Sequence, residues 1–71
     1  MTTPDERATL GAAVLTLSQL AARARRAAAA DPAHHTAHTA TALRCERVGA
    51  DLSALALDLT RAEDVVIREP R

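Results

Sequence analysis

Two proline-containing helix starts divide this chain into two segments. The first is "TPDE" at residues 3–6, where Thr3 can cap a helix, Pro4 suits the first helical position and Glu6 completes a capping box. The second is "DPAH" at residues 31–34, in which Asp31 can cap and Pro32 can open another helix. Because proline disfavours helical geometry at the preceding residue, the first helix should end just before Asp31. We therefore predict helices over residues 4–29 and 32–66, joined by a short connection.

Apolar residues in both segments recur at the spacing of a helix. In the first segment they are Leu10, Ala13, Val14, Leu17, Leu20, Ala21, Ala24, Ala27 and Ala28. In the second segment the spacing alternates between four and three along His34, His38, Thr41, Cys45, Val48, Leu52, Leu55, Leu59, Ala62 and Val66. Such alternation is typical of a coiled-coil seam, and a short connection makes neighbouring helices antiparallel. The predicted fold is all-α, a single long antiparallel helical hairpin over residues 1–71.

Gly49 is the position at which the second helix could be interrupted. Glycine costs about 1 kcal/mol in a helix interior, and Asp51 could cap a new start. The seam nevertheless keeps its phase from Val48 to Leu52. We predict one helix that can bend at Gly49, followed by a short frayed C-terminal tail.

The chain is too short and too poor in large side chains for a substantial core of its own. It has 71 residues, no Phe, Tyr or Trp, and a single cysteine, Cys45. Small domains usually add disulfides, a metal or a partner chain, and one cysteine allows no intrachain disulfide. Metal binding or oligomerisation is therefore expected.

Each predicted helix carries more apolar surface than one partner helix can cover. Pairing about Asp31 places Leu17 opposite Cys45 and Leu10 opposite Leu52, so the second helix would overhang from Leu59 onward. Second apolar lines follow Ala8, Ala12, Leu15 and Ala22, and Leu43, Ala50, Ala54 and Leu57. We predict a homodimeric four-helix bundle, with a helix of another protein as the alternative partner. The predicted interface consists of Leu10, Val14, Leu17, Val48, Leu52, Leu55, Leu57, Leu59 and Val66.

The three histidines give a second hypothesis. His34 and His38 are four residues apart, so they share a helix face and could chelate zinc, nickel or copper, with His35 as a further ligand. Cys45 lies about 10 Å from His38 along the helix axis and cannot join the same ion. If Asp31 is a cap, no carboxylate stands beside these histidines. They could instead set the helix register or make association depend on pH. The alternative function is thus a metal-binding or metal-responsive bundle, and no other cofactor is expected.

The run "RARR" at residues 23–26 gives a third hypothesis. Arg23 and Arg26 lie on one flank, where they could complement the helix dipole or contact the phosphates of DNA. The net charge of zero and the absence of aromatic residues argue against nucleic acid. A DNA-contacting regulator is therefore the weakest of the three functions.

Catalysis, membrane insertion and secretion have no sequence support. No Ser/His/Asp set is present, and Cys45 lacks a histidine within one turn to activate it. Arginines interrupt the longest apolar region, and residues 1–7 lack the features of a signal peptide. We expect a cytoplasmic, non-enzymatic protein that acts as a self-associating adaptor or accessory subunit.

Overall fold

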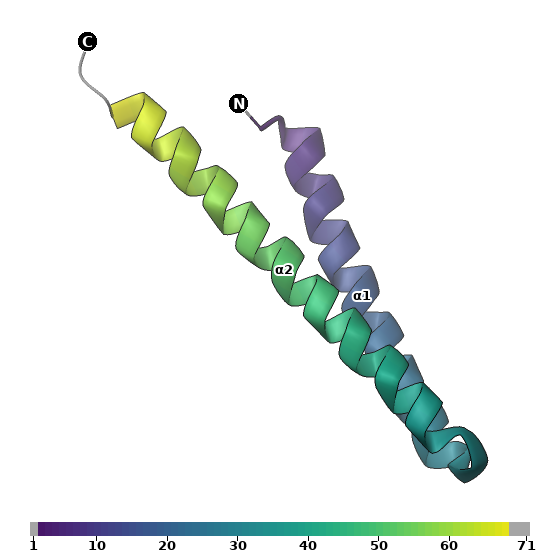
Figure 1. Ribbon diagram of the computed structural model, residues 1–71. Helices are drawn as coiled ribbons and strands as arrows, with labels where there is room; N and C mark the ends of the chain where they lie inside the picture. The colour runs from purple at the N-terminus through teal and green to yellow at the C-terminus, as the bar shows by residue number, and fades with distance from the viewer. Residues whose placement is uncertain (1, 69–71) are drawn as a thin grey trace.

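The computed structural model describes residues 2–68 and shows a helical hairpin (Figure 1). Helix α1 covers Pro4–Ala30, a short 3-10 helix η1 covers Pro32–His34, and helix α2 covers His35–Arg68. The predicted all-α hairpin is confirmed. Helix α2 passes through Gly49 without interruption and continues two residues beyond the predicted end at residue 66. Residues 69–71 of the predicted frayed tail lie outside the described residues.

The start of α1 has the predicted capping box. The Glu6 backbone N–H donates to Thr3 Oγ1 at 3.1 Å, and the Thr3 N–H donates to Glu6 Oε1 at 2.8 Å. These bonds satisfy two of the backbone donors that a helix start leaves unpaired. The backbone hydrogen bond from Thr3 is also the largest cause that lowers the pKa of the Glu6 carboxyl.

The connection differs from the prediction that Asp31 caps the second helix. The Asp31 side chain makes no capping bond, while its backbone oxygen accepts from the His34 N–H at 3.1 Å. Residues 32–34 form a 3-10 turn, so α2 begins at His35 rather than at Pro32. The Asp31 carboxylate is therefore free to contact side chains of the second segment.

Small residues form the seam between the two helices. The buried residues of the described chain are Ala21, Ala24, Ala28 and Ala42, and the seam of α2 alternates through His38, Ala42, Cys45, Gly49, Leu52, Ala56 and Leu59. The predicted seam is therefore right at His38, Cys45, Leu52 and Leu59. It is one residue off at the positions between them, because Thr41, Val48 and Leu55 are exposed and the residue after each of them lies in the seam. Small side chains let two helix axes approach closely, and the larger side chains then lie at the edge of the contact.

The register of the hairpin also differs from the predicted pairing. A Cβ placed on Gly49 would lie 3.7 Å from Leu17 Cβ, so Leu17 faces Gly49 instead of Cys45. The residues of η1 lengthen the connection and shift α2 by about one turn. Leu59 is consequently half-buried against α1, so the predicted overhang does not begin at Leu59, whereas Ala62 and Val66 are exposed.

The hairpin is one helix thick. Its principal extents are 62 × 18 × 10 Å, and the two helices separate toward the end that holds the termini, here called the open end (Figure 1). The radius of gyration is 16.9 Å, whereas a compact chain of this length has about 11 Å. Stable domains normally pack two layers of secondary structure around a core, and this chain supplies one.

Candidate functional site

The two long faces of the hairpin differ in the charges beside the seam, although exposed leucines, among them Leu43 and Leu57, lie on the more charged side. On one face Ser18, Arg25, Glu46 and Ser53 line a shared groove, and we call these residues the polar flank. Arg25 forms a two-point ion pair with Glu46, with Nη2 to Oε1 at 2.6 Å and Nε to Oε2 at 3.1 Å. This ion pair, led by the hydrogen bond from Arg25, lowers the pKa of the Glu46 carboxyl. The polar flank is therefore compatible with water.

The opposite face is apolar over most of its length, and the same heptad lines carry polar residues only at Thr41 and Glu6. Heptad spacing places Ala13, Leu20 and Ala27 beside the seam of α1 and Val48, Leu55 and Ala62 beside that of α2, and we call these six residues the apolar flank. Leu20, Val48 and Leu55 are 39%, 41% and 46% exposed. None of the hydrogen bonds or ion pairs found over residues 2–68 involves these three side chains. The apolar flank thus has the composition of a contact surface.

At the open end the apolar flank widens into a groove of about 730 Å³. Leu10, Leu55, Leu59, Ala62 and Val66 supply its apolar surface, while Asp5, Glu6 and Glu63 lie on its rim. The helices separate at this end (Figure 1), and the groove lies beside them there.

Glu63 joins the two helices at the open end. Its carboxylate accepts hydrogen bonds from the Thr2 backbone N–H and from the Arg7 guanidinium, and its side chain is 13% exposed. The hydrogen bonds from Thr2, followed by those from Arg7, lower the pKa of Glu63 from 4.5 to about 2. Glu63 had no place in the predicted site. Its pairing depends on the register of the hairpin, which local sequence does not encode.

The structure separates the predicted interface residues into two groups. Leu10, Val14, Leu17, Leu52 and Leu59 are half-buried in the seam between α1 and α2. Val48, Leu55, Leu57 and Val66 are exposed, and Leu57 lies across α2 from the apolar flank, on the side of the polar flank. Within this group, Val48 and Leu55 belong to the apolar flank.

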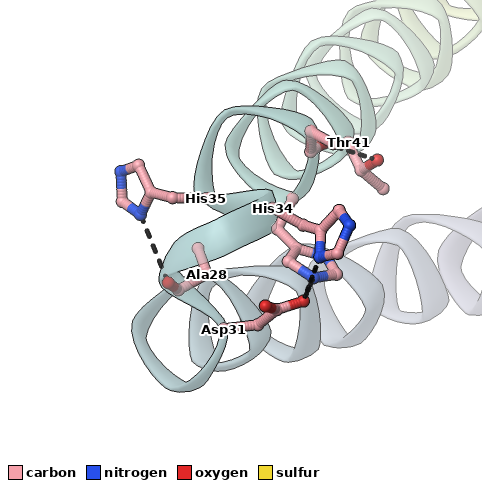
Figure 2. Close-up of polar contacts among 7 residues, drawn as sticks. Ala28, Asp31, His34, His35 and Thr41 are labelled. Atoms are coloured by element: carbon pink, nitrogen blue, oxygen red, sulfur yellow. Dashed lines mark hydrogen bonds and ion pairs between the residues drawn. The ribbon is translucent and has the colours of Figure 1, made fainter.

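The histidines cluster around the connection (Figure 2). Asp31 Oδ2 lies 2.9 Å from His34 Nδ1 and 3.2 Å from His38 Nε2, so one carboxylate oxygen holds both rings. The expectation that no carboxylate stands beside these histidines is therefore wrong. The hydrogen bond with His38 is the largest cause that lowers the pKa of Asp31, and His34 acts in the same direction. The cluster is local in sequence, since Asp31, at the C-terminal end of α1, precedes His34 by three residues and His38 by seven.

His35 points away from the other two rings and lies against the end of α1 (Figure 2). Its Nδ1 is 3.2 Å from the backbone oxygen of Ala28, one of the carbonyls that a helix end leaves unpaired. All three histidines thus have hydrogen-bond partners that fix the connection. Among residues 2–68 no group of three or more His, Cys, Asp or Glu side chains has an arrangement suited to a metal ion.

The remaining predicted side chains are distributed over the surface and the seam. Arg23 and Arg26 are exposed, whereas Arg25 of the same run pairs with Glu46. Cys45 is a free thiol, half-buried in the seam. Within the described chain, no histidine or carboxylate is hydrogen-bonded to the Cys45 thiol to activate it as a nucleophile.

No protein-family model, curated protein or solved structure matches this chain. Within the described residues, neither α1 nor α2 contains an apolar stretch long enough to cross a bilayer. Function is therefore inferred from the two flanks, the groove and the connection.

Proposed function

We propose that this protein is a non-catalytic interaction subunit that completes its core by pairing with a second copy through the apolar flank. The observation that carries this proposal is the composition of its interior. The fully buried side chains of residues 2–66 are four alanines, while the leucines and valines there are half-buried or exposed. Burial of large apolar side chains supplies most of the free energy of folding, so a core of alanines leaves the single hairpin with little stabilisation.

The exposed area supports the same conclusion. The chain exposes 5650 Å², whereas a compact monomer of 7.5 kDa exposes about 4,200 Å². The excess is about 1,400 Å² per chain, and a standard protein–protein interface removes about 800 Å² from each partner. A four-helix bundle made from two hairpins would remove an area of this order and add the missing second layer.

The polarity of the two faces favours the apolar flank as the interface. Packing the polar flank against another chain would remove Arg25 and Glu46 from water, which costs several kcal/mol per ion unless new bonds form. Packing the apolar flank removes Leu20, Val48 and Leu55 from water and desolvates no charge at these positions.

Two leucines on opposite sides of α2 provide a matched test. We expect Leu55→Asp to abolish the dimer, because it places a carboxylate inside the proposed interface. Leu57→Asp should leave the dimer intact, although Leu57 is the more exposed of the two at 58% against 46%. Sedimentation equilibrium of the wild type and both variants gives the masses. A Leu55→Asp protein that remains folded with the mass of the wild type would contradict the proposal.

Metal binding by His34 and His38 is a second proposal, supported by the closeness of the two rings, whose centroids are 6.4 Å apart. A bound ion would have to replace the two hydrogen bonds to Asp31. The test is native mass spectrometry of untagged protein purified without chelator. The proposal requires added mass for zinc, nickel or copper that disappears in a His34→Ala/His38→Ala variant.

A further inference from the structure

Charged residues beside the apolar flank are sorted by sign along the hairpin. Near the connection the flank is bordered by Arg23 on α1 and Arg44 on α2, each three or four residues from a flank position. Toward the open end it is bordered by Asp58 on α2, and by Asp5 and Glu6 on the rim of the groove. The contact face therefore has a basic end and an acidic end.

We infer that the second copy lies on the apolar flank end for end, so that the basic end of each chain covers the acidic end of the other. This inference rests on the proposed function and specifies its geometry. A two-fold axis across the middle of the face stacks α1 on α1 and α2 on α2 in opposite directions. Arg44 of each copy then lies at the level of Asp58 in its partner, and Arg23 lies near Thr9 and the acidic rim.

The other two-fold arrangement, with both connections at the same end, brings like charges together. It places Arg23 of each copy over Arg44 of its partner, and the acidic rim over the partner's Asp58. Like charges at an interface are destabilising and suppress the wrong mode of docking. One carboxylate opposes the inferred arrangement: Asp51 lies near the middle of the face and approaches its own copy. That single contact is outweighed by the two Arg44–Asp58 pairs and by the arginines that face the acidic rim.

The same arrangement accounts for the groove at the open end. End-for-end packing brings the narrow end of one hairpin, with Leu20 and Ala27, over the wide end of the other. Leu20 can then fill space beside Leu10 and Leu55, which the separated helices leave open. The connection end of each hairpin, where the helices are close, packs on the open end of the other, where they are separated. The bundle is therefore equally thick along its length.

The distance between the two connections tests the arrangement directly. In a Cys45→Ala background, Ala33→Cys places a single spin label at the exposed connection. End-for-end packing about Asp51 predicts a distance of roughly 50 Å between labels in the dimer, because about 1.5 Å of rise per residue separates Ala33 from Asp51 in each copy. A distance of about 20 Å or less would overturn the inference and leave the proposed dimer standing. A monomeric mass by sedimentation would overturn both.

Charge exchange provides an independent test at exposed positions. Arg44→Glu and Asp58→Arg should each weaken dimerisation, by roughly tenfold in Kd because each change occurs at both ends of the dimer. The double variant should recover most of that loss, since it restores opposite charges across the interface. Additive losses in the double variant would contradict the inferred pairing. Arg47→Glu, on the outer surface of α2, is the control and should leave Kd unchanged.

Discussion

At the scale of single residues, the connection and the open end are each fixed by one carboxylate. Asp31 contacts His34 and His38 from the end of α1, and Glu63 receives Thr2 and Arg7 across the two helices. The Asp31 cluster is local in sequence, because Asp31 lies seven residues before His38, although Asp31 itself lies outside the helices. Glu63 and Arg7 are 56 positions apart, and no local pattern predicts their contact.

Gly49 gives a prediction about helix stability. Gly49→Ala should raise the free energy of unfolding by about 1 kcal/mol, because alanine is the better helix former. The added Cβ would meet Leu17 Cβ at 3.7 Å, an ordinary van der Waals distance. Gly11→Ala, which meets nothing within 4 Å, is the control and should stabilise by a similar amount. Urea denaturation at fixed protein concentration measures both; a Gly49→Ala variant less stable than wild type would mean that the helices approach more closely than described.

Glu63 gives a prediction about pH. Its pKa in the folded state is about 2, below the ordinary value of 4.5, so its hydrogen bonds from Thr2 and its ion pair with Arg7 stabilise the fold fully above pH 4.5. That stabilisation is lost as the pH falls through about 2. The wild type should therefore exceed Glu63→Gln in stability at neutral pH and lose this advantage between pH 4.5 and 2. Denaturation of both proteins across this range tests it, and a difference that does not change with pH would contradict the ion pair.

At the scale of elements, the sequence predicts the two helices well and their contact only in part. The capping box at Thr3, the proline at residue 32 and the heptad spacing locate α1 and α2 to within a few residues. The sequence places the wrong residues of α2 against α1, because hydrophobicity favours Val48 and Leu55. In the structure the helices meet through Gly49 and Ala56. Close approach of two helices rewards small side chains, and a hydrophobicity pattern gives these little weight. The small size of Gly49 and Ala56, compared with Val48 and Leu55, is the sequence signal that could have identified the correct seam of α2.

Ala42 tests the corrected seam. Its side chain is fully buried between the helices, so Ala42→Leu should destabilise the protein by about 1–3 kcal/mol through overpacking. Ala40→Leu makes the same change on the exposed surface of α2 and should have little effect. Thermal unfolding followed by circular dichroism distinguishes the two variants. If both variants unfold at the same temperature, the seam predicted from the sequence, in which Thr41 faces α1, would be favoured instead.

At the scale of the whole molecule, the hairpin is a single layer of two helices. Its 10 Å thickness provides one layer, and its wedge shape leaves a groove at the open end. The sequence predicts that such a layer needs a partner, through its lack of aromatic residues and its surplus of apolar lines. It does not identify the contact face, because the distinction between the two flanks depends on the seam phase and on the Arg25–Glu46 ion pair. Once these are known, the apolar flank and its sorted charges favour the partner and the orientation that we propose.

The central claim is that the hairpin is stable only as a pair. The most direct measurement is the mass of the untagged protein by sedimentation equilibrium over a dilution series, with circular dichroism recorded on the same samples. The account predicts a folded species of twice 7.5 kDa that loses helicity as dilution separates the chains. A species of 7.5 kDa with full helicity at every concentration would contradict it.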